Sequence, residues 1–377
     1  MDHMEYTAFA KALTAVPDPR QTRGQRYPWE LLVVLIGAAL LSGEQHGRAI
    51  GQWVAERTEK LSEWLGWDGV RLPSEATLRR AVQAMDLVAL EACLTDWIVP
   101  QCTADETELT GIAIDGKWVR GAGAHGREVH LLSTVQHDGL VLEQTAVPAG
   151  SNEITVAPSL LAGYDLAGTV ITADALLSQR ELAAQILAQG SDYLLPIKGN
   201  QPESQEAIAA LFDAAPWQHP HWPDTYQHHT SVEKGHGRLE QRTLEASPIL
   251  NAWLRWPAVG QVLKRTCRRT ELSTGELTES VIYAVTSLPF GTALARIEQL
   301  WRGHWTIENR VHYIRDVTFG EDAGQAYRGN TPQVLAALRN AVLNLLRLRG
   351  WTRIADALRH FAAHPTRALA AIGVNPS

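Results

Sequence analysis

The chain has 377 residues, more than a single compact core usually contains, so two or three domains are expected. A hydrophobic fraction of 45% and a charged fraction of 20% are ordinary globular values, which exclude a disordered or collagen-like protein. The net charge of −7 argues against a generic DNA-coating protein, but residues 301–377 hold ten arginines against five acidic groups, a local charge of +5, which leaves a site-directed DNA-binding protein possible.

The compartment follows from three features of the sequence. The three cysteines are scattered without the spacing of metal ligands, which fits a reducing environment. The longest apolar run, residues 31–41, is too short to cross a bilayer, and the first residues do not have the pattern of a signal peptide. We therefore expect a soluble cytoplasmic protein with no membrane partner.

Residues 1–105 are predicted to form a helical N-terminal domain. Pro28 precedes the apolar run, where it suits the first turn of a helix. Ser74 is a candidate N-cap for a later helix that carries Arg79 and Arg80. Two interpretations remain open: a helix-turn-helix that reads DNA through these arginines, or an amphipathic bundle with a solvated basic edge.

Residues 106–215 alternate between strand-like and helix-like patterns. Three strands come first, and helices and strands then follow each other, which describes a mixed sheet covered by helices. Strands are predicted at 109–119, 129–135, 140–147, 169–173 and 193–197, and helices at 154–161, 178–189 and 202–212.

Residues 216–290 are predicted to form a β-rich insertion that begins with a proline-rich loop at 216–223. The insertion carries a basic cluster that is either a contact surface for the DNA backbone or a solvated face: Lys264, Arg265, Arg268 and Arg269. From residue 291 to 377 the helical period returns, and these residues are expected to complete the domain that begins at residue 106.

Acidic residues at strand ends are the strongest chemical signal. Asp115 follows the apolar strand Gly-Ile-Ala-Ile, and Asp174 follows Val-Ile-Thr-Ala. A carboxylate at the end of a buried strand is costly unless it is paired, hydrogen-bonded or bound to a metal. The two aspartates, with Glu308 as a third carboxylate, are therefore candidate ligands of a hard divalent cation, while capping of the following helix is the alternative.

A series of short motifs runs through almost the whole chain. Each motif is weak alone, but their number and order make the match specific. The chain resembles bacterial insertion-sequence DDE transposases of the type that includes the H-repeat-associated proteins of Rhs elements. In chain order the motifs are Val16-Pro17-Asp18-Pro19-Arg20, Arg23-Gly24, Tyr27-Pro28, Ala113-Ile114-Asp115-Gly116-Lys117 with Arg120-Gly121, Ser151-Asn152-Glu153-Ile154, Thr172-Ala173-Asp174-Ala175, Lys198-Gly199-Asn200-Gln201, His236-Gly237-Arg238, Arg302-Gly303-His304-Trp305 with Ile307-Glu308-Asn309, and Asp316-Val317-Thr318-Phe319-Gly320-Glu321-Asp322.

This resemblance implies a ribonuclease-H-like α/β domain, a mixed sheet flanked by helices. It also implies that Asp115, Asp174 and Glu308 hold two Mg²⁺ ions, with Mn²⁺ as a substitute, for two-metal phosphoryl transfer. Glu153 stays outside this predicted metal site, as a residue of a helix start.

Several polar residues near these motifs are candidates for DNA contact, and a solvated surface is the alternative for each. They are Lys117, Arg120, Lys198, Arg302, His304, Asn309 and Arg315, besides the insertion cluster and Arg79 and Arg80.

One motif departs from a related group of transposases. That group carries a tyrosine–arginine–glutamate–lysine signature, and at the same spacings this chain has Trp301, His304, Glu308 and Arg315. Arg315 is still able to contact a phosphate, more rigidly than lysine, whereas His304 is only partly cationic at neutral pH. Trp301 could stack on a displaced base or belong to the core. The hairpin intermediates associated with the signature are therefore not implied.

The predicted function is a Mg²⁺-dependent transposase that cuts the ends of its own element and joins them to target DNA. Its partner is double-stranded DNA, which the N-terminal region reads at the terminal repeats, and pairing of two ends calls for a homodimer on DNA in the nucleoid. The alternatives are a domesticated or inactive DNA-binding derivative and a ribonuclease-H-like nuclease without strand transfer.

Overall fold

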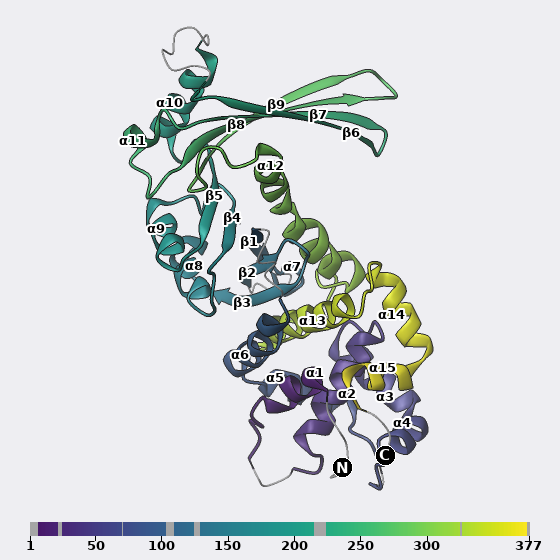
Figure 1. Cartoon of the computed structure of the whole chain (residues 1–377). Coiled ribbons are helices and arrows are strands. Elements are labelled where there is room, and N and C mark those ends of the chain that lie inside the picture. The colour runs from purple at the N-terminus through teal and green to yellow at the C-terminus, as the bar shows by residue number, and fades with distance from the viewer. Residues whose placement is uncertain are drawn as a thin grey trace. The chain divides into compact units, whose positions relative to one another are not determined.

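The computed structural model describes residues 7–21, 25–69, 71–102, 109–123, 129–214, 224–324 and 326–374 (Figure 1). The chain forms two compact units, the first of residues 1–103, 116–151 and 307–377 and the second of residues 104–115 and 152–306. Strand β1 (Thr110–Trp118) continues from the second unit into the first. The Arg23-Gly24 motif, the domain boundary near residue 105 and the loop at 216–223 lie outside the described residues.

The N-terminal part of the first unit is helical, as predicted. Its helices are α1 (Ala8–Ala15), α2 (Trp29–Leu41), α3 (Gly47–Glu56), α4 (Thr58–Trp64), α5 (Glu75–Ala84) and α6 (Leu87–Ile98), followed by η1 (Val99–Gln101). Helix α2 starts directly after Pro28, and every residue except Glu30 is buried, because a helix that is apolar all round is stable only inside a core. No described helix is both long enough and apolar enough to span a membrane.

The rest of the first unit is a hairpin with helices. Strands β2 (His130–Gln136) and β3 (Val141–Val147) pair in antiparallel fashion. The side chain of Asn344 accepts a hydrogen bond from the Val141 N–H at 2.9 Å and donates one to its carbonyl at 2.7 Å, as a neighbouring strand would. The remaining elements are α7 (Arg120–Gly123), the π-helices η3 (Ile307–His312) and η4 (Ile314–Thr318), α13 (Thr331–Leu348), α14 (Ile354–Ala363) and α15 (Pro365–Ile372).

The second unit is built on a mixed sheet, whose strands run in the order β1-β4-β5-β9-β8-β7-β6. Strands β1, β4 (Thr169–Ala173) and β5 (Asp192–Ile197) are parallel, and β9 (Leu277–Thr286) pairs antiparallel with β5. The sheet then continues through β8 (Gln261–Glu271), β7 (Arg238–Ser247) and β6 (Gln227–Gly235). This arrangement confirms the predicted mixed sheet, and residues 227–286 supply its β-rich insertion.

Five helices belong to the second unit: α8 (Glu153–Leu161), α9 (Arg180–Ala188), α10 (Pro202–Asp213), α11 (Asn251–Leu254) and α12 (Leu294–Gly303). Helix α10 begins at its proline, as predicted, because proline suits the first turn. Helix α9 begins two residues later than predicted. The Ser178 hydroxyl donates to the Asp174 carbonyl instead of capping this helix.

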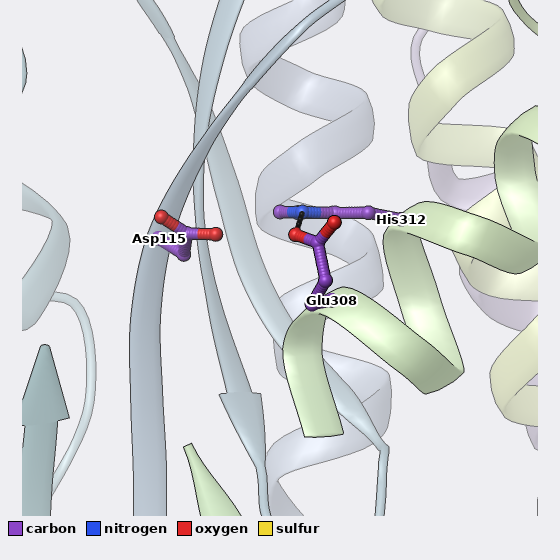
Figure 2. Close-up of side chains that lie close together, drawn as sticks. All are labelled: Asp115, Glu308 and His312. Atoms are coloured by element: carbon purple, nitrogen blue, oxygen red, sulfur yellow. Dashed lines mark ion pairs between the residues drawn. The ribbon is translucent and has the colours of Figure 1, made fainter. Parts of the chain in front are cut away.

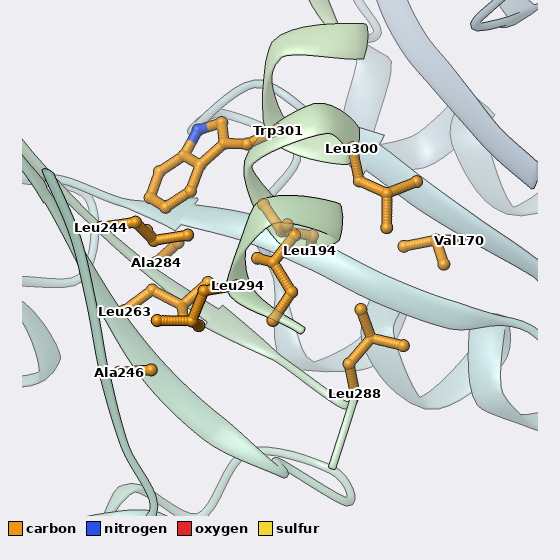
Figure 3. Close-up of a cluster of buried hydrophobic side chains, with 11 residues drawn as sticks. Val170, Leu194, Leu244, Ala246, Leu263, Ala284, Leu288, Leu294, Leu300 and Trp301 are labelled. Carbon is orange, nitrogen blue, oxygen red and sulfur yellow. The ribbon is translucent and has the colours of Figure 1, made fainter. Parts of the chain in front are cut away.

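One hydrophobic cluster joins the insertion to the rest of the second unit (Figure 3). Helix α12 contributes Leu294, Leu300 and Trp301, which pack against side chains of β7, β8, β9 and the central strands. Trp301 is buried in this cluster, and the Arg265 guanidinium lies 4.5 Å from its ring centre. Trp301 is therefore a core residue, and the predicted stacking on a displaced base does not fit its position.

Candidate active site

Two of the three predicted carboxylates come at the same end of two neighbouring strands. Strands β1 and β4 are parallel neighbours, and their last paired residues are Ile114 and Ala173. Asp115 is the next residue of β1, and Asp174 directly follows the end of β4; both are partly buried. Neighbouring strands lie about 4.8 Å apart, so the backbones of the two aspartates leave the sheet at one edge.

The turn after β4 holds the Asp174 side chain. Its Oδ1 atom accepts a hydrogen bond of 3.0 Å from the backbone N–H of Leu177. The predicted alternative is a cap of the following helix, but Asp174 caps the turn after β4, and α9 begins only at Arg180. This cap is compatible with a ligand role, because the capping bond uses one of the two carboxylate oxygens and fixes the orientation of the other.

Glu153 is a carboxylate that we did not include in the predicted site. It is the first residue of α8, its side chain is buried, and Asn152 caps the helix by accepting from the Thr155 N–H at 3.2 Å. Burial, together with the nearby carboxylate of Asp174, raises the pKa of Glu153 to about 7. The second unit therefore gathers a third acidic group near Asp174, and the only sequence signal was its place in the Ser-Asn-Glu-Ile motif.

Lys198 lies at the same edge of the sheet. It follows the last residue of β5, the parallel neighbour of β4, and its side chain is exposed. The next turn is tied to the segment after Asp174, because the Asn200 side chain donates to the carbonyl of Ala175. The exposed ammonium group of Lys198 thus belongs to the end of the strand next to the one that Asp174 follows. Its position fits the predicted contact with a phosphate.

Glu308 is the second residue of the π-helix η3 in the first unit. Its side chain is 57% exposed, and its Oε2 atom lies 3.6 Å from Nδ1 of His312 (Figure 2). Burial lowers the pKa of His312, although Glu308 opposes this effect, so the imidazole is predominantly neutral at pH 7. Asp115, Glu308 and His312 each offer an atom that can ligate a metal ion, and His312 was not singled out from the sequence.

His304 ends α12 and contacts the central sheet of the second unit. Its Nδ1 atom lies 3.3 Å from the hydroxyl of Thr172, which precedes Asp174 by two residues on β4. The ring is half-buried. This contact joins the end of α12 to β4. It is a structural role for His304, in addition to the DNA contact predicted for it.

Arg315 belongs to a buried ion network in the first unit. Its side chain is 0% exposed, donates to Glu321 at 2.7 and 3.1 Å, and reaches Oε1 of Gln144 at 2.9 Å. Arg339 also binds Glu321, at 3.0 Å. Burial alone would raise the pKa of Glu321, but the two arginines outweigh it and lower the pKa to about 2. The predicted phosphate contact of Arg315 is therefore corrected: its donors are used inside the protein.

Lys117 needs the same correction. Its side chain is buried, and its Nζ atom lies 2.5 Å from Asp316 and 3.7 Å from both Glu321 and Asp322. A buried ammonium group is stable only with such partners. Lys117 is thus an internal cation and not a contact for the DNA backbone.

The basic cluster of the insertion is neutralised by carboxylates of the second unit. Lys264 lies 3.1 Å from Asp213, and Arg268 lies 2.6 Å from Glu279. Arg269 pairs with Glu240 at 3.0 Å, and Arg265 covers Trp301. Arg302 makes two bonds to Glu233, of 2.6 and 2.9 Å. Charges paired in this way attract DNA weakly, so the geometry favours the alternative of an internally paired face.

Four further predicted contacts lie at the surface. Arg120 is 84% exposed and lies 3.9 Å from Asp322, and Asn309 is exposed next to Glu308. On α5, Arg79 pairs with Glu75 at 3.2 Å, while Arg80 is exposed and its Nε atom donates to the Ala76 carbonyl. These side chains are accessible to a ligand.

Two family models match the sequence. Residues 104–345 match the family described as "Transposase DDE domain", and residues 10–98 match the family described as "DDE_Tnp_1-associated".

Named proteins of Escherichia coli are similar over most of their length. "Putative transposase YncI" of strain O157:H7 is 29% identical over 89% of this chain and 86% of its own. "H repeat-associated putative transposase YhhI" of strain K12 is 27% identical over 91% of both chains. Among solved structures, a piggyBac transposase synaptic complex with hairpin DNA aligns with 97% of this chain and 81% of its own, at 9% identity and a TM-score of 0.46.

Proposed function

The chain belongs to the family of transposases with a DDE domain, and we propose that it cleaves the ends of a mobile DNA element and joins them to target DNA. The observation that carries this proposal is that Asp115 lies on β1 and Asp174 directly follows the end of β4, its parallel neighbour. Two carboxylates at one sheet edge, with a lysine from the next strand, form a site for metal ions and a phosphodiester. The reaction would take place on chromosomal DNA in the bacterial cytoplasm.

The donor set fits a hard divalent cation. Asp115 and Glu308 belong, with His312, to a group of side chains able to hold a metal ion, and Asp174 would add a third carboxylate. Carboxylate oxygens are the ligands that Mg²⁺ and Mn²⁺ prefer. Bound there, a pair of such ions would polarise the scissile phosphate and stabilise the attacking and leaving oxygens of an in-line displacement. The Leu177 N–H would keep the Asp174 carboxylate in one orientation.

The connection from α12 supports Glu308 as the third ligand. His304 contacts β4 through Thr172, and four further residues along the chain lead to Glu308. Four residues span at most about 14 Å even when extended, and about 6 Å along a helix. We propose that His312, through its contact with Glu308, keeps this carboxylate turned toward the ions.

DNA would approach this edge from solvent. Lys198, Arg120 and Asn309 are predicted contacts with exposed side chains, and they would bind phosphates of the DNA backbone. The helical N-terminal part would read the terminal repeats, with Arg80 as an exposed candidate on α5. Joining two ends to one target calls for two active sites, so the active species would be a homodimer on DNA.

The test is cleavage of duplex DNA that carries the element's terminal repeat, with Mg²⁺ or Mn²⁺. Asp115→Asn, Asp174→Asn and Glu308→Gln are each expected to lower the cleavage rate at least a hundredfold with unchanged DNA affinity. Asp165→Asn is the matched control, because this exposed aspartate caps the turn before β4, at the opposite end of the strand. Full cleavage by the Asp115 or Asp174 variant would refute the assignment.

Strand transfer needs a separate measurement. Pre-nicked element ends with free 3′-hydroxyl groups are supplied together with a target plasmid, and joined product is expected from the unmodified protein. Cleavage without joined product would instead identify a nuclease that lacks the transfer step.

A further inference from the structure

The first unit contains a cavity of about 620 Å³ between α3, α5 and the segment that leads into α13. Helices α3 and α5 pack closely because Gly51 has no side chain: a Cβ there would lie 2.3 Å from the Cβ of Glu75. This packing brings Arg48 of α3 and Arg79 of α5 to one wall, and Arg328 lines the cavity from the segment before α13. The family site proposed above does not use this cavity.

The cavity carries an excess of positive charge. Arg79 is paired with Glu75 at 3.2 Å, the only acidic residue of the lining. Arg48 and Arg328 are exposed, and neither has an ion-pair partner within the described parts of the chain. Three arginines against one glutamate leave a formal charge of +2. A concave basic site of this kind is complementary to a phosphate.

Two helices begin at the cavity. Gly47 is the first residue of the ten-residue α3, and Thr331 is the first residue of the eighteen-residue α13. The first turn of a helix presents backbone N–H groups and the positive end of its dipole, which favours anions. Helix α13 begins without a side-chain cap.

Thr331 gives an independent indication of a ligand. Its side chain is 9% exposed and lines the cavity, and its Oγ1 atom has no hydrogen-bond partner among the described residues. A buried hydroxyl without a partner is unfavourable, and an oxygen of a bound ligand would accept its hydrogen bond. The hydroxyl lies where α13 begins, next to Arg328.

The remaining walls of the cavity are suited to a nucleoside, the part of a nucleotide that carries the base and the sugar. Val82 and Leu335 are apolar, and the ring of Tyr327 is at the rim. Gly329 has a φ of +53°, a left-handed conformation that turns the chain between Arg328 and α13. The volume lies within the usual range of about 300–1,000 Å³ for small-molecule sites.

We propose that this cavity binds one nucleotide of a DNA strand, with its phosphate at Arg48, Arg328 and Thr331 and its nucleoside against Val82 and Leu335. The proposal rests on the proposed function, because it assumes that DNA is the substrate. It adds a second DNA site, built from the helical part and the C-terminal helices of the first unit.

The test measures DNA binding by the full chain without a catalytic metal, using a fluorescent duplex with a terminal repeat and a single-stranded overhang. Arg48→Ala and Arg328→Ala are each expected to weaken binding about tenfold and to reduce the slope of log affinity against log salt by about one. Arg353→Ala is the control, because this arginine is 86% exposed and lies outside the cavity lining. Thermal unfolding of each variant verifies its fold.

Deoxyadenosine monophosphate serves as the small probe. It is expected to raise the melting temperature of the unmodified protein and of Arg353→Ala, but not of Arg328→Ala, since binding to the folded state alone stabilises it. Inorganic phosphate is expected to act more weakly, and an equal effect would overturn the nucleoside half of the proposal. Affinity and salt slope in both cavity variants equal to those of Arg353→Ala would overturn the site while leaving the proposed cleavage untouched. Absence of DNA binding by the unmodified protein would overturn both.

Discussion

Arg315→Met tests whether Arg315 stabilises the fold or binds DNA. The substitution keeps an unbranched side chain of similar length but removes the charge. It removes the bonds to Glu321 at 2.7 and 3.1 Å and the bond to Gln144 at 2.9 Å. Removing one partner of a buried ion pair costs about 3–5 kcal/mol. Because Arg339 still binds Glu321 at 3.0 Å, we expect a cost at the lower end of this range: the free energy of unfolding should fall by about 3 kcal/mol.

The measurement is urea unfolding followed by tryptophan fluorescence, at pH 7 and at pH 4. The pKa of Glu321 is lowered to about 2 in the folded state, so its ionisation stabilises the fold above its unfolded pKa, near 4.5, and this stability is lost as the pH falls toward 2. The variant should therefore lose less stability on acidification than the unmodified protein. Arg353→Ala should change the unfolding free energy by under about 0.5 kcal/mol. An unchanged unfolding midpoint together with weaker DNA binding would refute a structural role for Arg315.

Three further predictions concern other charges and the core. Burial raises the pKa of the Glu91 carboxyl group to about 8 in the folded state, whereas the unfolded chain releases this proton near pH 4.5. The free energy of unfolding should therefore fall by about 2 kcal/mol between about pH 4.5 and 8, a value reduced because the side chain is partly exposed. In urea titrations at several pH values, Glu91→Gln should make this fall smaller. Trp301→Ala should lower the free energy of unfolding by about 3–5 kcal/mol in the same assay, because it leaves a cavity in the hydrophobic cluster around α12. If Trp301 served only to stack on a DNA base, the substitution would leave the stability unchanged. Glu233→Gln should cost under about 1 kcal/mol despite its two bonds to Arg302, because the pair is largely solvated, and a larger loss in thermal unfolding would contradict this.

Local patterns were sufficient for the elements of the central sheet. Strand β4 has the predicted bounds, 169–173, because its five residues are all buried and Asp174 ends the apolar run. Parallel strands that are covered on both faces give continuous apolar segments of this kind. The pairing of β4 with β1, and so the meeting of Asp115 and Asp174, depends on contacts distant in sequence, which no local pattern specifies.

The charged residues were harder to assign from the sequence. Arg315 follows Glu308 at the spacing of the lysine in the related signature, but its partners are Gln144 of β3 and Glu321. A sequence shows which residues are charged and leaves open which carboxylates lie beside them. The contact of His312 with Glu308 depends in addition on the π-helix η3, a geometry that has no recognised residue pattern.

The buried network has a consequence for how variants of the acidic motifs are interpreted. Asp115 and Lys117 are two residues apart on β1, so they project to the same face of the strand. Lys117 is held at 2.5 Å by Asp316, whose neighbour in sequence is Arg315. The network that contains Arg315 and Glu321 therefore fixes the part of β1 that continues directly from Asp115. A change at Arg315 would then reach the proposed metal ligand through the strand, with no contact to DNA. Loss of cleavage in such a variant identifies a DNA contact only if the unfolding free energy and its pH dependence stay as they are in the unmodified protein.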